Sequence, residues 1–337
     1  MVKGGKSLST VPQAALVGCG YWGKNLCRNF HALGALYAVV DATENGQAAA
    51  RFLAPNAIIS DNFDAILIDD QIQGVALATP AETHAELAIQ AMRAGKDVFV
   101  EKPMALSISD AEAMQTVANE TGRILMVGHL LEFHPAVLKL RELIDSGELG
   151  KINYIYSNRL NFGKVRTEEN ALWSFAPHDV AVILRLLGQS PLEVSASGGA
   201  YLMHDVADVT VCNLRFSDDS RAHIFVSWLH PYKEQRLVVV GDQKMATFND
   251  VNPFGEKLHI YPQSVEFDGT LPILKKEDAQ FIEHANTEPL REECAHFLDC
   301  IQSRKQPLTN AQSGIDVLKV LHACQASIDQ NGMPISL

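Results

Sequence analysis

Short apolar runs without alternation mark the first third of the chain. Runs such as AALVG (14–18) and GVALATP (74–80) are separated by segments whose apolar residues recur at helical spacing, as in 83–94. Continuous apolar strands that alternate with helices predict a parallel sheet covered on both faces. The predicted strands are 14–18, 35–41, 74–80, 97–103 and 124–128, and the predicted helices are 20–34, 83–94 and one capped by Ser109.

Beyond Pro135 the pattern becomes one of alternation. In RAHIFVSW (221–228) every second residue is apolar, and VTVCNLRF (209–216) precedes it across a turn of Ser and Asp, which predicts an antiparallel hairpin. The segment 234–248 repeats the pattern around Gly241-Asp242. Helical spacing recurs over 135–146, 289–303 and 311–329.

These patterns predict an α/β fold of two domains. The first, residues 1–131, is expected to be a doubly wound α/β domain of the Rossmann type. The second, residues 132–337, is an α+β domain for substrate binding and oligomerisation with a mostly antiparallel open sheet. The outward face of that sheet is rich in β-branched and aromatic residues and is expected to pack against another subunit.

Composition narrows the class of partner. The 337 residues include 28 Lys and Arg and 40 Asp and Glu, which gives a net charge of −12. This charge argues against a surface built to bind nucleic acid or an anionic membrane. No apolar run approaches the ~18 residues of a membrane span, and the first residues lack a signal-peptide core, so we expect a cytoplasmic protein. The six cysteines form no CxxC pair and are expected to be reduced, buried thiols.

A glycine-rich turn follows the first predicted strand. Gly18, Gly20 and Gly23 form G-x-G-x-x-G at the start of a helix, and Asp41 ends the next strand. The glycines permit a tight turn, close approach of a pyrophosphate, and packing of helix on strand. Asp41 can accept hydrogen bonds from a ribose diol and would repel a 2′-phosphate, which predicts NAD rather than NADP.

Two further positions are candidates for proton transfer. Glu101-Lys102-Pro103 ends a predicted strand, where a doubly wound sheet binds its ligand, so Lys102 is a candidate to hold and relay a proton. Its spacing equally allows a solvated lysine with Pro103 turning the chain. His178 precedes an apolar helix predicted over 180–187 and is a candidate general base, with a capping or core position as the alternative.

A cluster of cations lies in the second domain. Arg159, Lys164 and Arg166 could hold a diphosphate near a cleft, and solvated loop charge is the alternative. Cys19 is interpreted as a small residue filling the glycine turn. No His and carboxylate spacing matches a metal-ligand set, so no metal is predicted.

In this order, the motifs resemble the glucose–fructose oxidoreductase / inositol dehydrogenase / MocA family over nearly the whole chain. The resemblance implies that Lys102 and His178 line the cleft between nicotinamide and substrate. The matching features are the GYWG turn, Ala78-Thr79-Pro80 with His84, Glu101-Lys102-Pro103, Gly128-His129 and His178. The implied cofactor site comprises Gly18, Gly20, Tyr21, Trp22, Gly23, Asp41, Thr79, Pro80, His84, Glu101 and Lys102.

Residues 158–179 resemble the nucleotide-sugar branch of that family. Many members carry Asp or Asn four residues before the histidine, where this chain has Ser174, and a serine cannot hold a charged histidine as a carboxylate would. The implied substrate site comprises Arg159, Asn161, Lys164, Arg166, Trp173, Ser174 and His178.

The resemblance implies NAD-dependent oxidation of the C3 hydroxyl of a UDP-sugar, UDP-N-acetylglucosamine above all, to the 3-keto sugar. His178 would take the hydroxyl proton and Lys102 would stabilise the alkoxide or relay the proton, or the two roles would be exchanged. The product would pass to a PLP-dependent 3-aminotransferase in lipid A or cell-surface polysaccharide synthesis. The family also implies a homodimer or homotetramer. The alternatives are a dehydrogenase of a free polyol or sugar, of the inositol type, and a non-catalytic NAD-sensing or scaffold protein.

Overall fold

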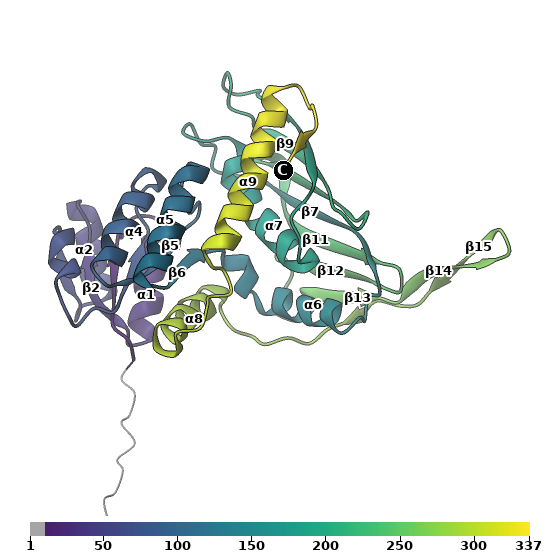
Figure 1. Cartoon of the computed structure of the whole chain (residues 1–337). Helices are drawn as coiled ribbons and strands as arrows, with labels where there is room; N and C mark the ends of the chain where they lie inside the picture. Colours follow the sequence, from purple (N-terminus) through teal and green to yellow (C-terminus); the bar gives the residue numbers. More distant parts are fainter. Residues whose placement is uncertain (1–10) are drawn as a thin grey trace, which may run out of the picture. The chain divides into compact units, whose positions relative to one another are not determined.

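The computed structural model describes residues 11–337 (Figure 1). The chain divides into two units, each containing segments that are distant in the sequence. Unit 1 comprises the described residues up to Gly128 together with Leu290–Gln312, and unit 2 comprises His129–Pro289 together with Ser313–Leu337.

Within residues 11–337, unit 1 contains a six-stranded parallel sheet in the order β3-β2-β1-β4-β5-β6. The central strands β1, β4 and β5 bury every residue, as expected for a sheet covered on both faces. The strand order reverses between β1 and β4, where sheets of this kind bind ligands at the carboxyl ends of the strands. The strands are β1 (Ala14–Val17), β2 (Leu36–Val40), β3 (Ile58–Ser60), β4 (Gly74–Leu77), β5 (Asp97–Glu101) and β6 (Leu125–Gly128).

Helices cover both faces of this sheet. Right-handed crossovers place α1 and α2 on one face and α4 and α5 on the other, and the members of each pair contact one another. Helix α8 joins the α1 side, where the Phe297 ring meets Phe30 and Phe99 edge-on at 6.4 and 5.9 Å. The helices are α1 (Gly23–Ala32), α2 (Glu44–Leu53), α3 (Phe63–Leu67), η1 (Ala81–Thr83), α4 (His84–Arg93), α5 (Ile108–Thr121) and α8 (Pro289–Ser303).

Unit 2 is built on a nine-stranded mixed sheet, counted over the described residues, in the order β16-β13-β12-β11-β7-β10-β9-β8-β17. Strand β7 pairs in parallel with β10, and the other pairs are antiparallel. A separate hairpin, β14–β15, extends beyond the sheet (Figure 1). The strands are β7 (Ile152–Phe162), β8 (Glu193–Gly199), β9 (Val209–Arg215), β10 (Arg221–Ser227), β11 (Leu229–Gly241), β12 (Met245–Asn249), β13 (Leu258–Tyr261), β14 (Gln263–Asp268), β15 (Leu271–Lys276), β16 (Gln280–Phe281) and β17 (Ile335–Ser336).

The core of unit 2 lies between this sheet and the helices packed on one of its faces. The alternating residues Ala222, Ile224, Val226 and Trp228 are all buried in it, as the sequence pattern predicts. The opposite face carries partly exposed aromatic rings. The helices are η2 (Leu130–Phe133), α6 (Pro135–Asp145), α7 (Ala171–Leu187), η3 (Phe254–Glu256) and α9 (Ala311–Asp329).

Several sequence predictions are confirmed. Both hairpins form with the expected pairing, and α8 and α9 begin and end at the predicted residues. All six cysteines, which lie among the described residues, are buried free thiols. No helix within the described range of the chain is long and apolar enough to cross a membrane.

Other features differ from prediction. The cap of α5 is Ser107, not Ser109, because the Ser107 hydroxyl accepts the Asp110 amide at 3.0 Å from an extended backbone. The second domain was expected to be continuous over 132–337, whereas Leu290–Gln312 belongs to unit 1. The spacing of apolar residues in α8 predicts a buried face but does not identify the sheet that covers it.

Candidate active site

Three glycines shape the turn between β1 and α1. Gly18 has a φ of +91°, and a Cβ atom there would lie 2.7 Å from the carbonyl oxygen of Ala78. A Cβ at Gly23 would lie 2.0 Å from the Gly18 carbonyl oxygen, because helix α1 starts directly against the turn. A Cβ at Gly20 would meet no described atom within 4 Å, so space remains for a pyrophosphate to approach the backbone. The turn fits the dinucleotide that its sequence predicts.

Asp41 is fixed at the end of β2 by hydrogen bonds. Its Oδ2 accepts the Cys19 amide at 2.6 Å, and its Oδ1 accepts the amide and hydroxyl of Thr43 at 2.8 and 2.7 Å. Burial opposes ionisation of Asp41, but the hydrogen bonds from Thr43 and Cys19 outweigh it and lower the pKa. Gly46 makes room for the carboxylate, since a Cβ there would lie 2.1 Å from its Cγ. A fixed anion therefore stands beside the glycine turn, with a lone pair on Oδ2 left to accept from a ribose hydroxyl.

Glu101 connects the glycine turn to the end of β5. The Trp22 indole donates to Oε1 at 2.5 Å, and the Lys102 amide donates to Oε2 at 3.2 Å. Burial raises the pKa of Glu101 to about 7, and the hydrogen bond from Trp22 and the charge of Lys102 lower it only in part. Gly128 leaves space for this carboxyl group, since a Cβ there would lie 3.0 Å from Oε2. Lys102 thus follows a residue that can change its protonation state near neutral pH.

The His84 side chain bridges the segments that follow β4 and β5. Its ring nitrogens lie 2.9 Å from the carbonyl oxygen of Pro103 and 3.0 Å from that of Thr79. Burial lowers the pKa of the ring, which favours neutral imidazole donating to one of the two carbonyls. Thr79 also accepts the Thr83 hydroxyl at 2.7 Å, and Pro80 precedes that turn. The hydrogen bonds of His84 and Thr83 therefore fix the conformation of the segment around Thr79 and Pro80.

His178 lies inside helix α7, not ahead of a helix starting at 180. Asn170 caps α7 by accepting the Trp173 amide at 3.2 Å, and Pro177 lies within the helix. Since proline commonly breaks helices, the sequence favours a start after His178; here tertiary packing retains the preceding turns. Ser174 is buried one helical turn before His178, on the same face.

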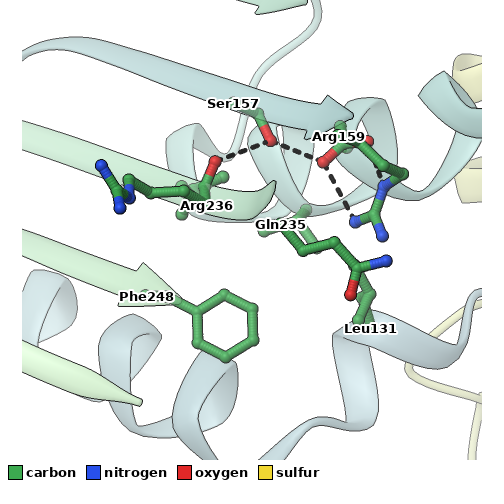
Figure 2. Close-up of a pocket in the computed structure, with 9 residues that line it drawn as sticks. Leu131, Ser157, Arg159, Gln235, Arg236 and Phe248 are labelled. Carbon is green, nitrogen blue, oxygen red and sulfur yellow. Dashed lines mark hydrogen bonds and ion pairs between the residues drawn. The ribbon is translucent and has the colours of Figure 1, made fainter. Parts of the chain in front are cut away.

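The three predicted diphosphate cations occupy two different settings in unit 2. Arg159 lies on β7 with its side chain 12% exposed, and its guanidinium bonds Asp179 at 2.7 and 3.2 Å (Figure 2). Lys164 and Arg166 lie in the exposed loop that follows β7, where Arg166 pairs with Glu169 at 3.1 Å. The predicted three-cation cluster is therefore divided between a buried ion pair and a surface loop.

The other predicted substrate residues also belong to unit 2. Asn161 is partly buried near the end of β7, with its amide against Gly163. The half-buried Trp173 ring meets His322 edge-on at 5.0 Å. The predicted cofactor residues and Lys102 lie in unit 1, where the glycine turn, Asp41, Thr79 and Glu101 follow strand ends of one sheet.

Sequence reasoning missed two site features. Trp22 and Glu101 were expected only to touch the cofactor, and their hydrogen bond joins segments 79 residues apart. Asp179 was not singled out, although its position next to His178 was a signal for a role at the site. The hydrogen bonds between Trp22 and Glu101 and between Arg159 and Asp179 join distant segments, so no local sequence pattern reveals them.

Comparison with known proteins identifies both units. A model described as an oxidoreductase family with an NAD-binding Rossmann fold matches residues 13–129, and a model of the GFO/IDH/MocA C-terminal domain matches residues 137–247. The predicted fold class is thereby confirmed for each unit.

Three relatives differ in the reaction that their names describe. A UDP-N-acetylglucosamine 3-dehydrogenase of Acidithiobacillus ferrooxidans is 26% identical over 91% of this chain and 94% of its own length. A 2,7-anhydro-N-acetylneuraminate hydratase of Mediterraneibacter gnavus is 31% identical, but over 62% of this chain and only 59% of its own length. A scyllo-inositol 2-dehydrogenase (NAD(+)) of Bacillus subtilis is 27% identical over 81% of this chain and 80% of its own length. A solved structure of the Acidithiobacillus enzyme, 24% identical, superimposes with a TM-score of 0.82 over 94% of this chain and 97% of that one.

Proposed function

Because the chain belongs to the Gfo/Idh/MocA family of NAD-binding oxidoreductases, we propose that it oxidises the C3 hydroxyl of a UDP-sugar, UDP-N-acetylglucosamine above all. The observation that carries this proposal is the match to a UDP-N-acetylglucosamine 3-dehydrogenase along nearly the full length of both chains. The product is the 3-keto sugar, whose carbonyl group is the substrate that a PLP-dependent 3-aminotransferase requires.

Residues of unit 1 hold the cofactor. Bound NAD supplies the hydride acceptor. The glycine turn receives the pyrophosphate at the start of α1, and Asp41 accepts hydrogen bonds from the adenosine ribose. Trp22 and Glu101 fix the turn relative to Lys102. The ammonium group of Lys102 is assigned to the reacting oxygen.

Proton transfer is assigned to Lys102 and His178. His178 accepts the proton of the sugar hydroxyl, and Lys102 stabilises the alkoxide or relays that proton, or the two residues exchange these roles. The positive charge of Lys102 is needed most when the oxygen becomes negative, so its loss affects turnover more than cofactor binding.

Lys164 and Arg166 hold the diphosphate in this proposal. Both lie in an exposed loop of unit 2, and arginine pairs with phosphate oxygens through two parallel donors. Arg159 is withdrawn from that role because its guanidinium is already paired with the buried Asp179 carboxylate. The sugar and uridine are assigned to Asn161, Trp173 and Ser174.

A second copy of the chain is proposed to cover the outward face of the unit 2 sheet. There the Tyr156 and His223 rings stack at 5.2 Å, with Tyr154 38% exposed. Broad aromatic surfaces of this kind are enriched at interfaces between subunits. The proposed assembly is a homodimer or homotetramer.

The alternative function is oxidation of a free polyol, supported by the match to the scyllo-inositol dehydrogenase. NADH formation is therefore measured with UDP-sugars, free sugars and inositols. A 3-aminotransferase is included because oxidation of a secondary alcohol by NAD is uphill near neutral pH. Turnover restricted to UDP-N-acetylglucosamine supports the proposal, and turnover restricted to inositols replaces it with the alternative.

Lys102→Met tests the catalytic assignment. Turnover is expected to fall at least ~100-fold with NAD affinity little changed, since general acid–base groups contribute about that much. Lys139→Met, which removes an exposed lysine paired with Glu142 on α6, is the control. Full turnover by Lys102→Met would remove the lysine from the mechanism, whereas NAD binding without any turnover by the unaltered protein would favour the non-catalytic alternative.

A further inference from the structure

A buried ion pair lies directly beneath the helix that carries His178. Asp179 is 3% exposed, and each of its carboxylate oxygens accepts from Arg159, at 2.7 and 3.2 Å. The hydroxyl of Ser157 donates to the same carboxylate at 2.5 Å (Figure 2). Ser157 and Arg159 are two residues apart on β7, so both project from the same face of the sheet toward α7. Three hydrogen bonds thus join one residue of the helix to one strand.

This attachment fixes the rotation of α7. Consecutive helical residues are about 100° apart around the axis, so holding Asp179 against the sheet also sets the direction of His178. A two-pronged pairing of guanidinium with carboxylate defines an angle as well as a distance, which an apolar contact does not. The orientation of the imidazole therefore depends on how Arg159 holds its neighbour.

Helix α7 needs such an attachment at this point. Pro177 has no amide hydrogen, so the helix lacks the hydrogen bond to the carbonyl of Trp173. Asp179, two residues beyond this interruption, is bonded to the sheet through Arg159. The ion pair thus stabilises the direction of the helix where its own hydrogen bonding is weakest.

The pocket beside the Arg159–Asp179 pair is too small for a diphosphate. The pocket beside the pair holds about 10 Å³, room for about one water molecule. Asp179 outweighs the effect of burial and raises the pKa of the guanidinium further, so Arg159 stays protonated.

We propose that Arg159 and Asp179 are positioning residues that orient His178 for proton transfer. This inference rests on the proposed function of His178. Buried ion pairs contribute little net stability compared with apolar residues of similar size, so an effect on orientation, separable from stability, is the expected signature.

The test compares two Arg–Asp pairs that share the two-pronged geometry and a buried carboxylate, although the arginine side chain is 12% exposed in the Arg159 pair and 43% exposed in the Arg304 pair. In unit 1, Arg304 bonds Asp97 at 2.5 and 3.0 Å. Arg159→Lys keeps the charge but loses the two-pronged geometry, and Arg304→Lys does the same at the control pair. We expect kcat to fall about 10- to 100-fold in Arg159→Lys, the loss typical of a misplaced catalytic group. The KM for NAD is expected to stay within about twofold in both variants, and kcat is expected to stay unchanged in Arg304→Lys. Unchanged kcat in Arg159→Lys would overturn the inference.

A double variant separates orientation from stability. Asp179→Asn leaves a buried guanidinium without its counter-ion and is expected to lower both Tm and kcat. Arg159→Met combined with Asp179→Leu removes both charges and is expected to recover the Tm but not kcat. Recovery of both quantities would assign the pair a structural role only and overturn the proposal.

Failure of the proposed function gives a different result. If the unaltered protein oxidises no sugar or polyol of the panel, the dehydrogenase proposal fails, whatever the variants do. The orientation of His178 is then read from its imidazole NMR resonances, assigned by comparison with His178→Gln. Shifted resonances in Arg159→Lys but not in Arg304→Lys support the positioning role, and unchanged resonances contradict it.

Discussion

The indole of Trp22 donates a 2.5 Å hydrogen bond to the buried carboxyl group of Glu101. Trp22 belongs to the turn that fits a pyrophosphate, and Glu101 is the residue before Lys102. The same carboxyl group also accepts the Lys102 amide at 3.2 Å. The Glu101 side chain therefore connects the cofactor turn to the proposed catalytic lysine. Substitutions in the turn are accordingly expected to change kcat as well as the KM for NAD.

Trp22→Phe removes the donor but keeps an aromatic ring. Glu101 then loses the hydrogen bond that opposes the effect of burial, so its pKa is expected to rise above about 7. The KM for NAD is expected to rise and kcat to fall. Together these changes are expected to lower kcat/KM at least ~10-fold, consistent with loss of a hydrogen bond to a charged group. Steady-state kinetics with NAD as the varied substrate provide the measurement.

Glu101→Gln is the matched comparison, because its amide oxygen still accepts from the indole but cannot ionise. Its KM for NAD is expected to rise less than in Trp22→Phe. Any dependence of kcat on pH near 7 that belongs to Glu101 should be absent. Equal KM values in Trp22→Phe and the unaltered protein would show that the turn and the carboxyl group act independently.

Asp41→Ala is expected to narrow the preference for NAD over NADP, since the carboxylate that repels a 2′-phosphate is lost. Thr43→Val keeps the carboxylate but removes one of the hydrogen bonds that lower its pKa, so an intermediate preference is expected. Thr121→Val, which removes a hydroxyl bonded within α5, controls for the substitution. Ratios of kcat/KM for the two cofactors provide the measurement, and equal use of both by the unaltered protein would refute the role of Asp41.

Lys164→Ala with Arg166→Ala is expected to raise the KM for a UDP-sugar about tenfold or more, the effect of losing about 1.4 kcal/mol of diphosphate binding. Arg93→Ala, an exposed site on α4, is the control. A KM for UDP-N-acetylglucosamine that does not change would place the diphosphate elsewhere. It would then favour a substrate without phosphate, such as an inositol.

Local sequence patterns predicted those parts of the site that local backbone conformation determines. The glycine turn needs a positive φ at Gly18 and space at Gly20, and both requirements are visible in a six-residue motif. The hairpin ending in Trp228 was likewise visible, because alternation and turn residues fix its register. The same local rules placed the start of α7 too late, since Pro177 indicates a helix start unless packing retains the earlier turns.

Contacts between distant segments could not be predicted in this way. Arg159 was predicted to hold a diphosphate together with Lys164 and Arg166, whereas pairing of β7 with β10 and β11 places it beneath α7. A charged residue in a strand can face solvent or a buried partner, and only the identity of the facing helix residue decides between them. For the same reason the location of α8 in unit 1 depends on its aromatic partners Phe30 and Phe99, which lie more than 190 residues earlier.

Glu132 in η2 is expected to make stability depend on pH. Burial raises its pKa to about 8, and Arg185, 4.0 Å away, lowers it only in part. An unfolded glutamate titrates near 4.5, so between those values the folded protein retains a proton that the unfolded chain has lost. The stabilisation is fully present below pH ~4.5 and is lost as the pH rises toward about 8, at no more than ~1.4 kcal/mol per pH unit.

Glu132→Gln replaces the protonated acid with a neutral group of the same shape. Its Tm at pH 5 is expected to match that of the unaltered protein, and its Tm should fall less between pH 5 and pH 8. Some decline remains, because the raised pKa of Glu101 acts in the same direction. Glu142→Gln, at an exposed position on α6, should leave the Tm–pH curve unchanged. Parallel curves for Glu132→Gln and the unaltered protein, measured by calorimetry over this range, would show that Glu132 is already ionised when folded.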